Sequence, residues 1–173
     1  MAHAILTAIG VDRAGLVDEV SRYIFDRGGN IEDSRMVNLR GQFALILLIE
    51  ADDAALLSIR QSLPAFADTI GLRLTLADST TAAGPLPGIP FKLKTYSMDQ
   101  PGIIHRVSDL LREFGVNIED LAARQESAPF AGTPLFLMEM RLTIPPKVSI
   151  STLRSKLTSL CDSLNCDVDF EPA

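Results

Sequence analysis

Apolar residues recur along the first half of the chain with two periods, which predict alternating strands and helices. Residues 4–9 and 43–51 are almost continuously apolar, as expected for strands inside a sheet. Between them, apolar side chains at spacings of three and four predict a helix, on Leu16, Val17, Val20 and Ile24. A strand over 30–39, a second helix and a closing strand complete a βαββαβ order. The apolar face of the second helix consists of Leu56, Ile59, Leu63 and Phe66. In the closing strand, the inward-facing apolar residues Leu72, Leu74 and Leu76 alternate with polar ones.

The second half repeats the first. Residues 12–33 read DRAGLVDEVSRYIFDRGGNIED, and residues 99–120 read DQPGIIHRVSDLLREFGVNIED. The two segments align without a gap, and nine positions are identical. A long period that occurs twice indicates two domains, over residues 1–78 and 91–173. The uncharged linker between them, 79–90, reads STTAAGPLPGIP. The fold class is therefore α+β, with two ferredoxin-like domains. Each has a four-stranded antiparallel sheet with both helices on one face.

Composition narrows the class of function. The formal charge is −6 and no run of Lys or Arg occurs, which argues against direct nucleic-acid binding. The longest apolar run, Phe43 to Ile49, is too short to cross a membrane, and no secretory signal is visible at residue 1. The two cysteines, Cys161 and Cys166, lack a zinc-binding spacing. These features predict a cytoplasmic protein with reduced thiols.

Two short sequence motifs are the most similar between the two halves of the chain. The first is DRAGL at 12–16, matched by DQPGI at 99–103, and the second is GGNI at 28–31, matched by GVNI at 115–118. This pairing resembles the signature of the ACT domain, a regulatory module that binds amino acids. The second copy fits fully, whereas the first has Ala14 where the family usually has proline. A stand-alone tandem of such domains resembles the glycine cleavage system transcriptional repressor family.

The resemblance implies a ligand site in each half. An α-carboxylate would suit the amides at a glycine-started helix, because a helix N-terminus favours anions. An aspartate could take the ammonium group, and an asparagine offers both a donor and an acceptor. The site residues are then Asp12, Gly15, Leu16 and Asn30 in the first half, and Asp99, Gly102, Ile103 and Asn117 in the second. In the family such sites form where two ACT domains meet. The same residues could instead only shape turns and helix starts.

The segment APFAGTPLF, over 128–136, is similar to a segment of the repressor family. It is expected to form a lid or a partner-binding loop, through Pro129, Phe130, Gly132 and Pro134, although a passive insertion is the alternative. The family implies a non-enzymatic regulator that senses a small amino acid, glycine foremost, and acts through a transcriptional activator protein. Bare sheet faces make a homo-oligomer plausible.

Three other classes of protein compete with this interpretation. No nucleophile–base pair, phosphate loop or metal cluster is visible, so catalysis is not expected. His3 and His105 have no ligand-type neighbour at metal spacing, and neither a metal nor a cofactor is expected. An RNA-binding module would need aromatic platforms and a basic surface, which the central strands do not offer. The remaining alternative is a tandem ACT scaffold that has lost its ligand.

Overall fold

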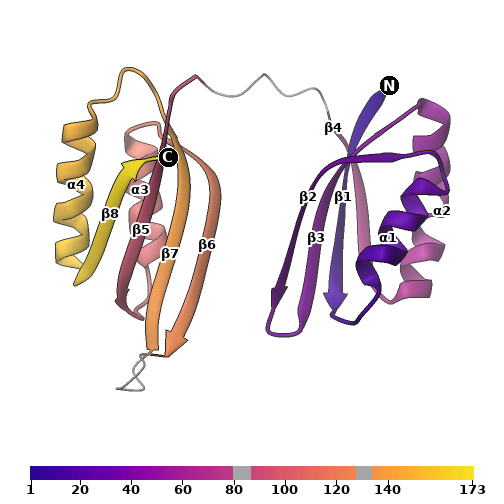
Figure 1. Ribbon diagram of the computed structural model, residues 1–173, viewed down its shortest axis with the longest axis horizontal. Coiled ribbons are helices and arrows are strands. Elements are labelled where there is room, and N and C mark those ends of the chain that lie inside the picture. Colours follow the sequence, from indigo (N-terminus) through magenta and orange to yellow (C-terminus); the bar gives the residue numbers. More distant parts are fainter. Residues whose placement is uncertain (80–86, 128–133) are drawn as a thin grey trace. The chain divides into compact units, whose positions relative to one another are not determined.

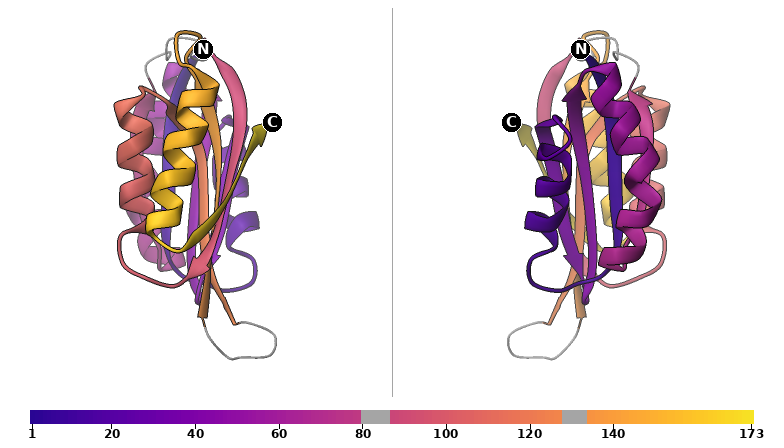
Figure 2. Two further views of the ribbon diagram at one scale, coloured as in Figure 1. Left: turned by 90° about the vertical axis from the view of Figure 1, so that its left-hand side faces the viewer. Right: turned by 90° about the vertical axis from the view of Figure 1, so that its right-hand side faces the viewer.

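The computed structural model describes residues 1–79, 87–127 and 134–173, and it divides the chain into two compact units, Met1–Ala83 and Gly84–Ala173. Each unit has the βαββαβ order and one four-stranded antiparallel sheet with its two helices on one face (Figures 1 and 2). The predicted fold class is confirmed. No helix among the described residues is long and apolar enough to cross a bilayer.

The first unit has the strand order β2-β3-β1-β4, so β1 and β3 are central and β2 and β4 are edges. All its strand pairs are antiparallel, and one β-bulge interrupts β2 between Ile31 and Asp33. Its elements are β1 (Ala2–Val11), α1 (Leu16–Phe25), β2 (Asn30–Leu39), β3 (Gln42–Ala51), α2 (Asp53–Ile70) and β4 (Arg73–Ser79).

The second unit repeats this plan with the order β6-β7-β5-β8 and a bulge at the matching place, between Ile118 and Asp120. Its elements are β5 (Ile89–Met98), α3 (Ile103–Glu113), β6 (Asn117–Ser127), β7 (Pro134–Ile144), α4 (Ile150–Ser163) and β8 (Cys166–Pro172). Strands therefore take up Ser79 and Ile89–Pro90, three residues that the sequence analysis assigned to the linker.

The predicted apolar face of α1 is correct at three positions and wrong at one. Val17 is exposed, and Tyr23 is buried in its place. The buried residues of α1 lie on a single helix face, at spacings of four, three and one. They are Leu16, Val20, Tyr23 and Ile24. Tyr23 fits this face because its hydroxyl lies 2.8 Å from the Ile59 carbonyl, so its polar atom is satisfied inside the core.

Helix α2 begins with a side-chain cap. The Asp52 carboxylate accepts a hydrogen bond from the Ala55 amide at 2.7 Å, as an N-cap aspartate does. We expect D52A to lower the free energy of unfolding by about 1 kcal/mol, because an amide at the helix start loses its partner. The matched control is D53A, which keeps the cap. Urea denaturation followed by circular dichroism would show the difference, and an equal loss in both variants would contradict the capping role.

The two sheets differ on the face that carries no helix. In the first unit Leu6 is buried and its neighbours on β1 point the other way, onto an open face with an apolar patch beside polar side chains such as Thr7 and Arg35. Side chains on this open face include Ile5, Ile9, Val37, Ile46 and Leu48. The matching face of the second unit carries Lys92, Lys94, Glu139 and Arg141. The apolar character of the first face is therefore not a requirement of the fold.

Both cysteines are buried and free, with Cys161 fully enclosed. Burial, together with the neighbouring Cys166, raises the pKa of the Cys161 thiol to about 12. We expect both thiols to resist a disulfide reagent at pH 8 in the native protein and to react once urea unfolds it. The raised pKa also means that the thiol's contribution to stability is complete below about pH 9 and is lost as the pH rises toward 12. Rapid labelling of native protein would contradict this expectation.

Candidate functional site

The first helix of each unit starts at a glycine in the left-handed region. Gly15 has φ 94° and Gly102 has φ 97°, a conformation that side chains disfavour. No side chain caps either helix start. Because the first amides of a helix have no intrahelical partner, each start presents free N–H donors and the positive end of the helix dipole. Leu16 and Ile103 bury their side chains in the cores, so they can offer a ligand only these backbone amides.

An aspartate precedes each helix start and is held by an amide side chain from the next strand. Asn38 Nδ2 donates to the carboxylate of Asp12, and Gln125 Nε2 donates to that of Asp99. The two pairs occupy the same place in the repeat. Neither helix has a side-chain cap, so the two aspartates do not satisfy the amides at the helix starts. Sequence reasoning missed Asn38 and Gln125, although the repeat aligns them at the same offset as the aspartates.

Each helix start opens into a hollow. In the first unit Asp12, Gly15 and Leu16 line a hollow of about 360 Å³, together with Met36 and Phe43. In the second unit Gly102 and Ile103 line one of about 410 Å³, together with Gln100, His105 and Phe136. The predicted glycine and the residue after it thus line a hollow in both units, whereas of the two predicted aspartates only Asp12 does so. The structure also adds a phenylalanine from the third strand of each unit.

The predicted asparagines lie at the other end of the sheets. Asn30 is level with Glu50 and His3 in the strand register, whereas Asp12 follows the far end of β1. The eight residue steps from His3 to Val11 span about 27 Å of strand. Asn117 is displaced from Asp99 in the same way. Within one unit the asparagines and aspartates are not brought together, and Asn117 instead donates to Glu119 at 2.5 Å.

The charged side chains at the two helix starts differ. The first turn of α1 carries Asp18 and Glu19, and the equivalent positions of α3 are His105 and the cation Arg106. The Asp18 carboxylate pairs with Arg22 at 2.9 Å. Glu19 is held by a two-pronged ion pair with Arg13, at 2.5 and 2.7 Å, and this hydrogen bonding lowers the pKa of the Glu19 carboxyl. An anion is therefore better accommodated at the start of α3.

Access to the two glycines also differs. A Cβ atom placed on Gly15 would lie 3.4 Å from the Glu19 carboxylate, whereas one on Gly102 would meet nothing within 4 Å.

Of the expected lid residues, Pro129, Phe130 and Gly132 lie outside the described residues. Pro134 begins β7, and its carbonyl accepts a hydrogen bond from the Asp99 amide at 3.2 Å.

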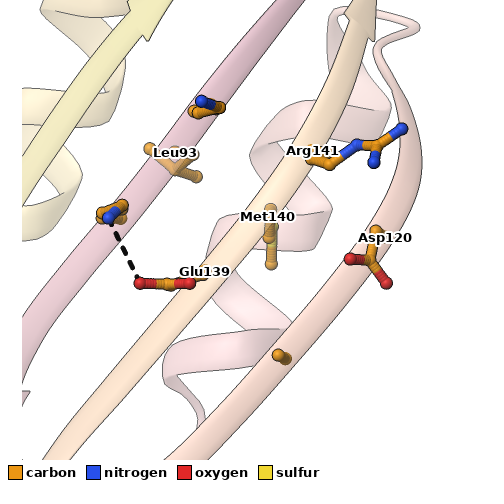
Figure 3. Close-up of a pocket in the computed structure, with 8 residues that line it drawn as sticks. Leu93, Asp120, Glu139, Met140 and Arg141 are labelled. Atoms are coloured by element: carbon orange, nitrogen blue, oxygen red, sulfur yellow. Dashed lines mark ion pairs between the residues drawn. The ribbon is translucent and has the colours of Figure 1, made fainter. Parts of the chain in front are cut away.

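A separate hollow of about 240 Å³ lies on the open face of the second sheet (Figure 3). Lys94 and Glu139 pair across it at 3.3 Å, and Arg141 stands opposite Asp120 on the neighbouring strand. The carboxylate of Glu139 raises the pKa of the Lys94 ammonium group. Three cationic side chains and two carboxylates line this hollow, and none of the predicted site residues does so.

Several known proteins are similar to this chain in sequence or in architecture. The family model of the ACT domain matches residues 2–76. The glycine cleavage system transcriptional repressor of Escherichia coli is 27% identical over 165 residues, which cover 94% of this chain and 86% of the repressor. An unknown protein from Galdieria sulphuraria has a crystal structure with a TM-score of 0.80 and 26% identity, covering 99% of this chain and 98% of that one.

A crystal structure described as a glycine cleavage system transcriptional repressor also shares the fold. Its TM-score is 0.71 at 20% identity, again over 99% of this chain and 98% of that one. Two βαββαβ units with glycine-started first helices thus define a tandem of ferredoxin-like domains. The first unit matches the ACT-domain family model, and the chain as a whole is similar to the glycine cleavage system transcriptional repressor.

Proposed function

We propose that this protein is a non-enzymatic regulator that binds a small amino acid, glycine foremost, and controls transcription through a partner protein in the cytoplasm. The observation that carries the proposal is the uncapped helix start at Gly102, three residues after Asp99, whose carboxylate is held by Gln125. Free amides and a helix dipole suit an α-carboxylate, and a fixed aspartate suits the ammonium group. The proposed ligand site is therefore the start of α3.

The sign of the local charge supports the second unit as the binding unit. The cation Arg106 favours an anion at α3, whereas the start of α1 carries Asp18 and Glu19, whose carboxylates pair with Arg22 and Arg13. Asn117 lies at the far end of its own sheet and is therefore not part of the proposed site at the start of α3.

The experiment is isothermal titration of the purified chain with glycine, serine and the other proteinogenic amino acids. We expect saturable binding that D99N abolishes, because the ammonium group loses its carboxylate. The matched control is D12N, which makes the same change in the first unit and should leave binding intact. If no amino acid binds, the scaffold alternative replaces the sensor.

The proposed partner is a transcriptional regulator, since the net charge of −6 disfavours direct contact with DNA. The open face of the first sheet supports a protein contact, because Ile9, Val37 and Ile46 are about half exposed there. We expect I46E to relieve repression of a glycine cleavage reporter while glycine binding stays unchanged. Salt-sensitive affinity of the purified protein for DNA would contradict this mechanism.

A further inference from the structure

Three strands of the first sheet bring a histidine and two glutamates together at one end of the open face. His3 on β1 is directly opposite Glu50 on β3, and Glu32 is the extra residue in the bulge of β2 (strands in Figure 1). His3 Nε2 lies 3.1 Å from Glu32 Oε2, and one ligand-type atom from each of the three side chains lies within 4.8 Å of the others. The sequence spacing gave no sign of this cluster, because register rather than proximity in the chain creates it.

We propose that His3, Glu32 and Glu50 form a binding site for a divalent transition-metal ion of the Zn²⁺ class. One imidazole and two carboxylates are ligands that Zn²⁺ accepts, with bond lengths near 2.0–2.2 Å. Two ligand atoms of a tetrahedral ion are then about 3.4 Å apart, close to the separation of His3 and Glu32. Water would complete the coordination, since the cluster lies on the partly exposed sheet face.

The electrostatics favour a cation. Glu32 and Glu50 place two carboxylates around one imidazole, so that like charges face each other unless a positive ion joins them. The imidazole distinguishes this site from a purely acidic cluster, because nitrogen ligands favour Zn²⁺ over Mg²⁺ and Ca²⁺.

The second unit shows that the fold does not require this cluster. At the matching positions it has Pro90 on β5, Thr143 on β7 and Glu119 in the bulge. The glutamate of the bulge is shared, but there it accepts a hydrogen bond from Asn117 instead of facing a histidine. The two ligands that complete the set, His3 and Glu50, are therefore specific to the first unit.

The test is titration of the untagged full chain with Zn²⁺, in competition with a chromogenic chelator. We expect one ion per chain and weak binding of Mg²⁺. H3Q and E50Q should each weaken Zn²⁺ binding by more than the roughly 10- to 100-fold that loss of an outer-shell partner costs. The matched control is E119Q, which removes the equivalent bulge glutamate of the second unit and should leave the affinity unchanged. Absence of saturable binding, or unchanged affinity in H3Q and E50Q, would overturn the proposal.

Two further measurements distinguish a metal at this cluster from a metal at the cysteines or one bound nonspecifically. Co²⁺ loaded in place of Zn²⁺ should show no thiolate charge-transfer band, and such a band would place the metal at Cys161 and Cys166 and overturn the assignment. Zn²⁺ should raise the melting temperature of the parent chain but not that of H3Q. Both outcomes are independent of amino-acid binding, because the cluster lies at the opposite end of β1 from Asp12.

Discussion

Replacing Tyr23 with alanine is expected to lower the free energy of unfolding of the first unit by about 3–5 kcal/mol, the range for truncating a buried aromatic residue. Tyr23 connects α1 to α2 through several contacts at once. Its ring stacks on Phe66 with centroids 4.0 Å apart, and its hydroxyl lies 2.8 Å from both the Ile59 carbonyl and the Ser62 hydroxyl. The guanidinium of Arg27 lies 3.9 Å from the ring centroid. Alanine would remove all of these contacts and leave a cavity between the helices.

The conservative variant Y23F separates packing from hydrogen bonding. It keeps the stack and the cation–π contact, so we expect a loss of only about 1 kcal/mol. Circular dichroism in urea measures both variants. The chain has two tyrosines and no tryptophan, and the second, Tyr96, lies in the other unit. Tyr96 fluorescence in Y23A therefore reports the second unit, and we expect its midpoint to be unchanged. A loss below about 1 kcal/mol in Y23A would show that α1 is held mainly by its aliphatic residues.

The fold was predictable because period, repeat and turn residues agree. The helix starts at Gly15 and Gly102 could also be located, since a left-handed residue between a strand and a helix favours glycine. Which residues complete the buried face of α1 was harder to predict. Val17 and Tyr23 both extend the apolar stripe of Val20 and Ile24, and only the hydrogen-bond acceptors on α2 favour the tyrosine. Those acceptors lie more than thirty residues away in the chain.

Tertiary register explains what the sequence left open around the sites. Asn30 and Asp12 were grouped because both survive in the repeat, yet a strand length separates them in space. His3 and Glu50 were not grouped because they lie far apart in the chain, although they face each other across β1 and β3. Repetition therefore indicates which residues matter, whereas the register decides which of them meet.

The substitution with the largest expected effect on ligand binding is G102V. At φ 97° a branched side chain is strained by about 1–3 kcal/mol, and its Cβ enters the open space in front of the α3 amides. This space is where the proposed carboxylate would lie. Since hydrogen bonds to a charged group contribute about 1.5–3 kcal/mol each, losing two of them should weaken glycine binding at least about 100-fold. Isothermal titration measures the affinity, and circular dichroism shows whether the variant is folded.

The first unit supplies a closely matched control. Gly15 has nearly the same backbone conformation, so G15V carries a similar strain in the same fold. Because that helix start carries Asp18 and Glu19 in place of His105 and Arg106, G15V should leave glycine affinity unchanged. Equal losses in the two variants would instead mean that each unit binds ligand or contributes to a shared site. Unchanged binding in G102V would exclude the start of α3 as the carboxylate site, even if the protein binds amino acids elsewhere.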